Sequence, residues 1–336
     1  SAIETSCAPQ RVRSREERTR TRKISRWRDT LESAAPAVDV HDMGWVLIVA
    51  CMGAGGALRA VGFGPQQVQG LNRYVIGVAV PALALVAIPK LELGSDALLA
   101  ACTPWLIFGI AWPLWTLVGR ARGWPGDKIA CMVLVTGLGN TAFLGYPLAQ
   151  STLGDAALPI AVLIDQLGSF FVFSTLGAFV AGGSGPGWVR LARFPPFLAL
   201  LFSLVSRGAP PLGAALAWVE PALTPIANTV VPVALVAVGA SIPLKRPTRA
   251  DGIVAVGLGF KMVLAPLLVV GLFSALGRYG LEARVAVLQA SMPPMVTASI
   301  LAQERGLAPE LAAKLVAFGI PVAALVVPII TGPWSP

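Results

Sequence analysis

The sequence is poor in the side chains that most metal centres and many enzyme active sites use. Its 336 residues include one histidine, His41, and four cysteines, Cys7, Cys51, Cys102 and Cys131. The cysteines form no CxxC pair and lack metal-ligand spacing, so neither a zinc site nor a redox-active pair is expected. We therefore predict a protein without a metal or other bound cofactor.

Charge is also scarce in this chain. Charged residues make up 13% of it and hydrophobic residues 55%, whereas soluble domains average about 25% charged and about 45–50% apolar residues. This composition excludes an ordinary soluble globular domain. It predicts an all-α polytopic membrane protein whose main partner is the lipid bilayer.

The first 42 residues depart from this composition. They carry nine Lys or Arg and seven Asp or Glu residues, without apolar periodicity and without the apolar core of a signal sequence. We predict a disordered tail over residues 1–42, and its net charge of +2 (nine minus seven) does not indicate a nucleic-acid partner. An alternative is that translation begins at Met43.

Apolar stretches alternate with short polar or Gly/Pro-rich joints from residue 44 onward. About 20 helical residues cross about 30 Å of hydrocarbon, so each stretch is a candidate transmembrane helix. The ten predicted spans cover residues 44–62, 70–89, 96–119, 129–150, 156–181, 194–206, 221–243, 252–275, 284–303 and 310–331.

Lys and Arg residues are unevenly divided between the two ends of these spans. With the amino terminus outside, twelve of them face the cytoplasm and four, Lys90, Arg207, Arg278 and Arg284, face outward. Cytoplasmic ends of membrane helices are enriched in Lys and Arg. We predict a multi-pass protein of the plasma (inner) membrane with both termini outside.

The chain contains an internal repeat. VAVPALALVAIPK at residues 78–90 matches TVVPVALVAVGASIPLK at residues 229–245, and their aligned prolines are 151 positions apart. Pro147 in the fourth span and Pro294 in the ninth are 147 positions apart. Two offsets near 150 indicate a duplication of five helices, and an odd number of helices inverts the second copy. The predicted repeats are residues 43–187 and 188–336.

The fourth and ninth spans combine proline with polar residues. Proline removes a helix hydrogen bond and frees carbonyl groups, which persist in a membrane only where protein, water or ligand contacts them. A simple proline kink is the alternative for either helix alone. Two opposed breaks that cross near the midplane would direct two helix amino ends, each with about half a positive charge, towards an anion. The predicted substrate-binding residues are Asn140, Thr141, Gly145, Pro147, Gln166, Ser291, Pro293, Pro294 and Thr297.

Two ionisable side chains lie well within predicted spans, Asp165 in the fifth and Lys261 in the eighth. A charge at the bilayer centre costs at least about 2.5–3.5 kcal/mol, so each should face the protein interior or a wet cavity. We interpret Asp165 as a carboxylate that couples transport to a proton or sodium ion, or as a polar group that contacts the substrate together with Gln166. Lys261 would contact the anionic substrate or the freed carbonyls. A structural ion pair that holds helices together is the alternative for both.

Four segments carry a resemblance to a known family. GNTAFLGYPLAQSTLGDAAL (139–158), ASMPPMVTASILAQERGL (290–307), LNRYVIGVAVPALAL (71–85) and GFKMVLAPLL (259–268) resemble the fourth, ninth, second and eighth helices of the auxin efflux carrier family, which includes bacterial malonate and malate permeases. The resemblance extends from Met43 to the end of the chain.

This resemblance implies ten helices in two inverted five-helix repeats with crossed broken helices, as in bile-acid and sodium/proton exchangers. It implies a scaffold part, residues 44–91 and 194–244, that forms a homodimer, and a transport part, residues 96–182 and 250–332. Asn140 and Pro147 match the family's fourth-helix substrate motif, and Pro293 and Pro294 match its ninth-helix motif. Ser291 and Thr297 stand where some relatives have an amide.

The rival classes are an intramembrane enzyme, a channel and a receptor. GGSG at residues 182–185 matches a serine-protease pattern, but His41 lies outside the membrane portion, and Asp165 has no acidic partner within a span. A channel or a ligand-sensing receptor could use the same broken helices. The sequence favours a symporter or uniporter that moves a small organic anion such as malonate, malate or an auxin-like acid by alternating access.

Overall fold

The structure is a computed structural model that describes residues 40–182, 189, 191–241 and 252–331. The chain divides into two compact units, Ser1–Met43 and Gly44–Pro336. Residues 1–39 of the predicted tail lie outside the described residues. Helix α2 begins at Val40, and the predicted tail over residues 1–42 stays a prediction.

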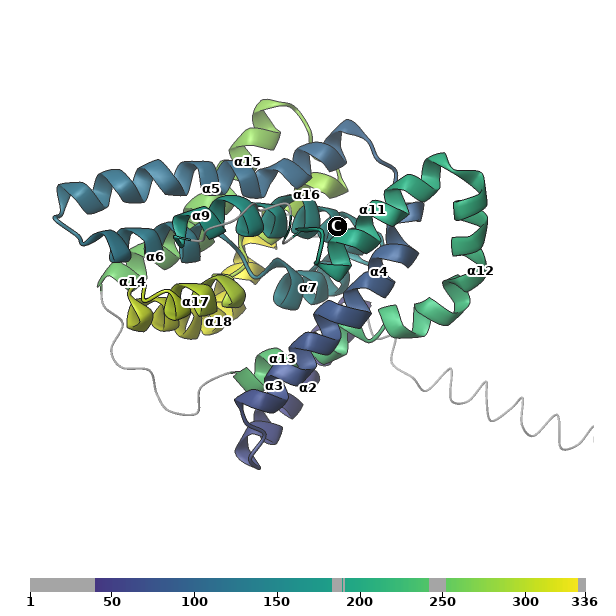
Figure 1. The fold of residues 1–336 in the computed structure, drawn as a ribbon, viewed down its shortest axis with the longest axis horizontal. Helices are drawn as coiled ribbons and strands as arrows, with labels where there is room; N and C mark the ends of the chain where they lie inside the picture. Colours follow the sequence, from purple (N-terminus) through teal and green to yellow (C-terminus); the bar gives the residue numbers. More distant parts are fainter. Residues whose placement is uncertain (1–39, 183–188, 190, 242–251, 332–336) are drawn as a thin grey trace, which may run out of the picture. The chain divides into compact units, whose positions relative to one another are not determined.

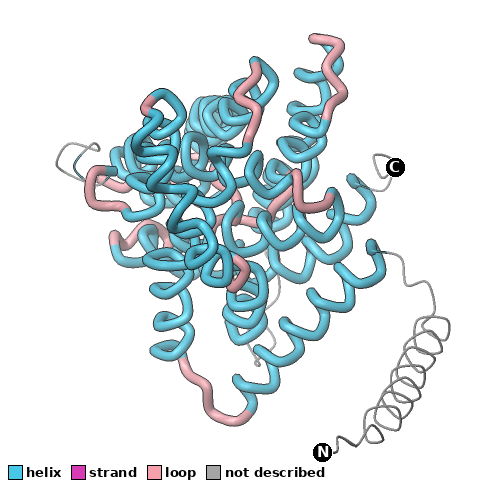
Figure 2. The backbone as a smooth tube through the Cα atoms, turned by 90° about the vertical axis from the view of Figure 1, so that its right-hand side faces the viewer, coloured by secondary structure: helices cyan, strands magenta, loops and turns pink. Residues whose placement is uncertain are grey.

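The described part of the chain is helical throughout, apart from turns, loops and one isolated bridge between two residues (Figure 2). This confirms the all-α prediction. The α-helices are α2 (Val40–Ala60), α3 (Pro65–Tyr74), α4 (Val80–Ala87), α5 (Ser95–Ala121), α6 (Gly126–Gly137), α7 (Tyr146–Leu153), α8 (Ala157–Leu163), α9 (Ala178–Val180), α11 (Pro195–Gly208), α12 (Pro210–Ala227), α13 (Val230–Ser241), α14 (Gly252–Gly259), α15 (Ala265–Ala275), α16 (Leu281–Ala290), α17 (Val296–Glu304) and α18 (Pro309–Thr331). The short π and 3-10 segments between them are η1 (Val75–Ala79), η2 (Ile88–Lys90), η3 (Thr141–Gly145), η4 (Ile164–Phe170), η5 (Phe173–Gly177) and η6 (Phe260–Leu264).

Several of these elements join end to end into helices of membrane-spanning length. Within the described residues, five such helices are long and apolar enough to cross a bilayer, which agrees with a polytopic membrane protein. They are Pro65–Lys90, Ser95–Ala121, Ala157–Val180, Pro210–Ser241 and Gly252–Ala275. The total of ten spans stays a prediction.

The helix that contains the seventh predicted span starts well before the predicted boundary. The seventh span, predicted to start at residue 221, belongs to a helix that starts at Pro210. Proline fits the first turn of a helix, because N–H groups there have no acceptor within the helix and the absence of one removes no hydrogen bond. Pro210 therefore starts α12 rather than ending the preceding helix.

The fourth predicted span is interrupted, but Pro147 is not the residue at the break. Helix α6 ends at Gly137, Leu138 is extended, and the helix resumes at Thr141. This break lies beside Asn140 and Thr141, the polar residues expected to flank it, whereas Pro147, to which it was attributed, lies in the first turn of α7. The π segment η3, in which the Gly145 N–H bonds to the Asn140 carbonyl at 3.2 Å, widens the turn just before the proline.

The ninth predicted span is interrupted between α16 and α17, and Pro293 and Pro294 lie in the gap. Helix α16 contacts α5, α7, α8, α15 and α18, and its residues from Val285 to Ala290 are all buried. Figure 1 shows the label of α16 near the middle of the view. The two interruptions therefore lie in the interior of the helical unit.

Helices α2 and α13 pack with their backbones in close approach. A Cβ atom on Gly239 would lie 2.1 Å from the Met52 carbonyl oxygen, and one on Gly55 would lie 2.2 Å from the Val236 carbonyl oxygen. Small residues permit such contact between membrane helices, where dispersion replaces the hydrophobic effect as the source of association. These two glycines therefore set the distance between α2 and α13.

Polar contacts join the end of α4 to α11 and α12. The Arg207 guanidinium donates hydrogen bonds to the carbonyls of Ile88, at 3.0 Å, and of Pro89 and Leu91. The Lys90 ammonium pairs with Glu220 at 2.5 Å. A cation at a helix carboxyl end satisfies carbonyls that lack partners within the helix.

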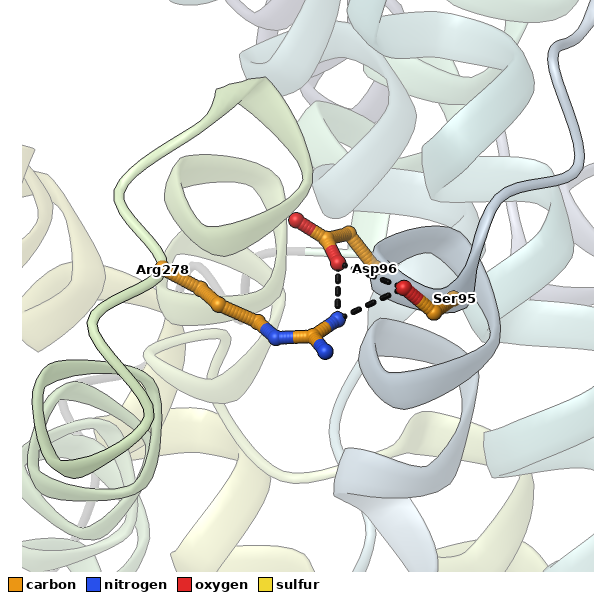
Figure 3. A network of polar contacts seen from close by, with 3 residues as sticks. All are labelled: Ser95, Asp96 and Arg278. Carbon is orange, nitrogen blue, oxygen red and sulfur yellow. Dashed lines mark hydrogen bonds and ion pairs between the residues drawn. The ribbon is translucent and has the colours of Figure 1, made fainter.

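A second polar cluster joins the turn after α15 to the start of α5 (Figure 3). Arg278 pairs with Asp96 and donates to the Ser95 hydroxyl at 2.8 Å, and Ser95 donates to Asp96 at 3.0 Å. The side chains of Arg278 and Asp96 are 35% and 38% exposed. Such a pair is screened by solvent and salt.

We expect Asp96→Asn to have only a small effect on stability. Exposed ion pairs contribute about 0.2–1 kcal/mol, so the melting temperature should fall by no more than about 2–3 °C, and less in high salt. Fluorescence-detected unfolding of the purified protein measures this change. Glu92→Gln, at an exposed carboxylate in the preceding loop, is the control. A fall of ten degrees would show that the contact is far stronger than its exposure implies.

Candidate functional site

The two interruptions contact each other through their backbones. The Asn140 N–H donates to the Pro293 carbonyl at 2.8 Å, and the Met295 N–H donates to the Leu138 carbonyl at 3.1 Å. Gly139 and Pro294 form an isolated antiparallel bridge. Backbone groups released from the two helices are thus satisfied by the other interruption rather than by lipid, which is what a buried break requires.

Two helix amino ends lie directly beyond this bridge. The segment η3–α7 starts at Thr141, and α17 starts at Val296 with Met295 at its N-cap position. The first N–H groups of a helix lack acceptors within it and carry positive partial charge. Neither N-cap side chain makes a capping hydrogen bond. The amino ends are therefore available to a ligand.

A cavity of about 70 Å³ adjoins both amino ends. Its walls combine polar groups from the interruptions and from η4 with apolar side chains from several other helices. The lining residues are Ile76, Val80, Gly139, Asn140, Thr141, Ala142, Phe143, Asp165, Gln166, Phe170, Phe194, Pro196, Met295 and Thr297. Four predicted substrate-binding residues, Asn140, Thr141, Gln166 and Thr297, are brought together here, together with Asp165.

Two buried amide atoms of residues that line this cavity lack partners. Asn140 is 3% exposed and its Nδ2 donor makes no hydrogen bond, while Gln166 is 1% exposed and its Oε1 acceptor makes none. An unsatisfied buried polar atom costs about 1–3 kcal/mol. One donor and one acceptor of residues that line the cavity are therefore unused, and a ligand that satisfied both would recover that cost.

Asp165 is buried behind this surface and accepts three hydrogen bonds. Its donors are the Thr141 hydroxyl, the Tyr146 hydroxyl at 2.8 Å and Gln166 Nε2 at 2.7 Å. Since a carboxylate only accepts, the bond to Nε2 fixes which end of the Gln166 amide faces Asp165. The Gln166 acceptor atom is consequently the one left without a partner.

A larger cavity, of about 330 Å³, meets the first one. The two share Ile76, Asn140, Phe143 and Thr297. Polar side chains of α3 and of the end of α13 also line the larger cavity, namely Gln69, Asn72, Arg73 and Ser241. Asn140 lies where the two cavities join.

Lys261 lies on the other side of the bridge. Its side chain is 1% exposed, and its Nζ donates to the Ala290 carbonyl at 2.6 Å. The partner is a carbonyl and not a carboxylate, so this contact matches the predicted contact with freed carbonyls rather than an ion pair. Lys261 lines a separate cavity of about 10 Å³.

The remaining predicted site residues do not line the 70 Å³ cavity. Gly145 packs against Gln289, and Pro147 lies buried in α7. Ser291 donates its hydroxyl to the Leu288 carbonyl at 2.7 Å at the end of α16. Pro293 and Pro294 contribute backbone to the bridge.

Sequence reasoning left out two residues of the site. Tyr146 is fully buried and donates to Asp165. Gln289 is 2% exposed, and neither atom of its amide has a hydrogen-bond partner. An amide within an apolar run beside two prolines was a signal for Gln289. Tyr146 gave none, because a tyrosine is common in membrane helices.

Paired helix interruptions, buried unpartnered amides and a cavity at two helix amino ends thus occur together in a helical membrane protein. The family described as "Membrane transport protein" matches residues 40–186 and again residues 184–331. The chain belongs to this family, the auxin efflux carrier family. It is a transporter and not an enzyme. Of the GGSG segment, only Gly182 lies within the described residues.

Curated relatives agree with this assignment. The chain is 28% identical over 288 residues to an "Uncharacterized transporter" of Methanothermobacter thermautotrophicus, covering 81% of this chain and 90% of the relative. It is 28% identical over 264 residues to another such transporter of Methanocaldococcus jannaschii, covering 74% and 83%. A "Putative malonate transporter" of Rhizobium meliloti is 25% identical over 266 residues, covering 73% and 80%.

Proposed function

We propose that this protein is a secondary transporter that carries a small organic anion, a carboxylate, through an alternating-access cycle. The observation that carries the proposal is the 70 Å³ cavity, where the unpartnered Asn140 donor and Gln166 acceptor lie beside two helix amino ends. In this proposal the fourth and ninth spans are broken helices that cross at the bridge between Gly139 and Pro294.

The charge of the substrate follows from the helix ends. Amino ends at Thr141 and Val296 favour a negative group by about 0.3–1 kcal/mol each at exposed sites, and by more where water is excluded. Asn140 Nδ2 adds a directed donor. A carboxylate can accept several such hydrogen bonds at once.

The Gln166 acceptor further limits which carboxylates are candidate substrates. Its unpartnered Oε1 requires a ligand that also donates, such as a hydroxyl or a second, protonated carboxyl group. The apolar side chains of Ile76, Phe143 and Met295 suit a short carbon chain. We propose malonate and malate as the first candidates and an auxin-like acid as the next, and the name of the Rhizobium meliloti relative supports malonate.

Interhelical hydrogen bonds support a division into a scaffold part, residues 44–91 and 194–244, and a transport part, residues 96–182 and 250–332. In the scaffold part they join Tyr74 to Thr229, Ser203 to Ala84, Lys90 to Glu220, and Arg207 to Ile88. In the transport part they join Asp96 to Arg278, Trp105 to Leu167, Trp115 to Thr136, Thr141 to Asp165, Lys261 to Ala290, and Ser299 to Ala312. Each of these bonds stays inside one part.

Contacts between the two parts are largely apolar. Helix α13 contacts η3 and α7, α4 contacts α8, and α11 contacts η4. The facing residues include Phe143, Val80 and Val238. Apolar surfaces slide with less cost than hydrogen-bonded ones, because no polar group loses its partner on the way. We therefore propose that the transport part moves against a scaffold that dimerises with a second copy.

The duplicated family match supports the repeat. The two matched segments, 40–186 and 184–331, meet close to the boundary between the repeats at residues 43–187 and 188–336. We propose that these halves are inverted five-helix repeats and that the chain has ten spans. The larger cavity reaches Arg73, which the charge rule assigns to the cytoplasmic end, so the proposed state is open to the cytoplasm in a protein of the plasma membrane.

Flux into liposomes that contain the purified protein tests the function. Labelled malonate should exchange for internal unlabelled malonate or malate at carrier-like rates, and each compound should raise the melting temperature. Conductance far above carrier turnover would instead indicate a channel, and binding without exchange would indicate a receptor. If no carboxylate bound or moved, the substrate assignment would be wrong.

We expect Asp165→Asn to remove the dependence of uptake on an imposed ion gradient. Asparagine has the size of aspartate, but its N–H₂ group is a donor. In the wild type three donors contact the Asp165 carboxylate, so in the variant the Gln166 amide loses its fixed orientation. Uptake should fall about tenfold and become independent of the imposed gradient. Asp155→Asn, at an exposed carboxylate near the end of α7, is the control. Unchanged gradient dependence would make Asp165 structural.

A further inference from the structure

Lys261 occupies an unusual position for a charged side chain in a membrane protein. It lies on η6, between α14 and α15, with 1% of its surface exposed. Its ammonium donates to the carbonyl of Ala290, the last residue of α16. The carboxyl end of a helix carries partial negative charge on carbonyls that lack helical donors. The contact is therefore electrostatically favourable.

A second helix carboxyl end lies at the same place. Helix α6 ends at Gly137, and a Cβ atom on Gly139 would lie 3.1 Å from Lys261 Nζ and 3.4 Å from the Gln289 carbonyl oxygen. The ammonium thus lies against the chain just beyond α6 as well as against the end of α16. A side chain at position 139 would therefore crowd the ammonium, which would have to shift by a few tenths of an ångström.

The surroundings of the ammonium are polar and nearly closed. A cavity of about 10 Å³, enough for about one water molecule, adjoins it. Thr103, Thr141, Ser169 and Gln289 are among the residues that line this cavity. Both amide atoms of Gln289 are buried without a partner. A lysine has three N–H donors, so a water here could bridge the ammonium to Gln289.

We propose that Lys261 is a positioning residue that serves as a built-in cation, holding the carboxyl ends of α6 and α16 together behind the substrate cavity. In transporters with interrupted helices, freed carbonyls and half-helix carboxyl ends often coordinate sodium. Here the chain supplies the positive charge itself. The pairing of the two interruptions then needs no inorganic cation, and sodium has no role in transport. Only the statement about sodium in transport rests on the proposed function, and the positioning role of Lys261 does not.

The experiment measures the melting temperature of the full-length purified protein in matched chloride salts of choline and sodium. Wild type should melt at the same temperature in both salts. Lys261→Ala should melt at least about 5 °C lower in choline, because buried carbonyls lose their donor. n-Propylammonium has the three carbons and the ammonium group that this variant lacks, and it should restore most of the loss. Lys90→Ala, at an exposed lysine, should respond to neither salt nor amine.

Uncharged and near-isosteric probes separate charge from packing. n-Propanol should not restore Lys261→Ala, and Lys261→Met should be destabilised although its volume is similar. Stabilisation of the wild type by sodium over choline would overturn the proposal even if no variant could be purified. Equal rescue by propanol and propylammonium would also overturn it. Absence of carboxylate flux with the amine rescue intact would refute the proposed function and leave this inference standing.

Discussion

Asn140→Ala is expected to lower carboxylate uptake by about 10- to 100-fold while leaving the protein folded. The Nδ2 donor has no partner in the protein, so its loss breaks no internal hydrogen bond. Alanine keeps the backbone N–H that bonds to Pro293. A hydrogen bond to a charged group is worth about 1.5–3 kcal/mol, which corresponds to the expected loss. Initial rates of malonate uptake into liposomes measure it.

A matched control distinguishes the site from the fold. Asn228→Ala makes the same change in the exposed turn between α12 and α13 and should leave uptake and melting temperature unchanged. Thermal shift by malonate should disappear in Asn140→Ala and persist in the control. Uptake at the wild-type rate in Asn140→Ala would refute the assignment of the cavity as the substrate site.

Gly239→Val is expected to lower the melting temperature by about 5–10 °C, or to prevent isolation of folded protein. The first carbon of the new side chain would lie 2.1 Å from the Met52 carbonyl oxygen and 2.8 Å from its carbonyl carbon. These are backbone atoms, so the collision is relieved only if α2 and α13 separate. Overpacking costs about 1–3 kcal/mol or more, and separation also forfeits the close contact between the helices. Unfolding followed by fluorescence measures the effect.

Gly53→Val is the control for this prediction. Gly53 is also in α2, but a Cβ atom added there meets nothing within 4 Å. Both variants gain the same side chain in a membrane helix, so a difference between them reports packing and not helix propensity. If the two variants had the same melting temperature, close approach at Gly239 would not be what holds α2 against α13.

Much of the general architecture follows from composition and spacing. Long apolar runs make helices the only structure that satisfies the backbone in lipid, and the described elements are helical as expected. Polar residues such as Asn140 and Asp165 stand out in such runs because their burial is costly unless something contacts them. That cost is why sequence reasoning found the polar half of the cavity.

The location of the break was less predictable. The break beside Asn140 and Thr141 was attributed to Pro147, but the chain breaks at Leu138–Asn140 and forms the π segment η3 before the proline. A proline at the start of a helical turn loses no hydrogen bond. Whether a proline breaks a helix therefore depends on the turn that precedes it, which no residue pattern here specified.

The sequence by itself determined that this chain is a helical membrane protein with a resemblance to a transporter family and with polar groups in two interrupted spans. Only the tertiary structure decided which groups meet. Asn140 bonds to Pro293, Lys261 to Ala290, and Gln166 is left with a free acceptor. The first two contacts join residues far apart along the chain. The physical reason is that apolar periodicity fixes which residues are buried, whereas the packing of helices fixes the partner that each buried polar group finds.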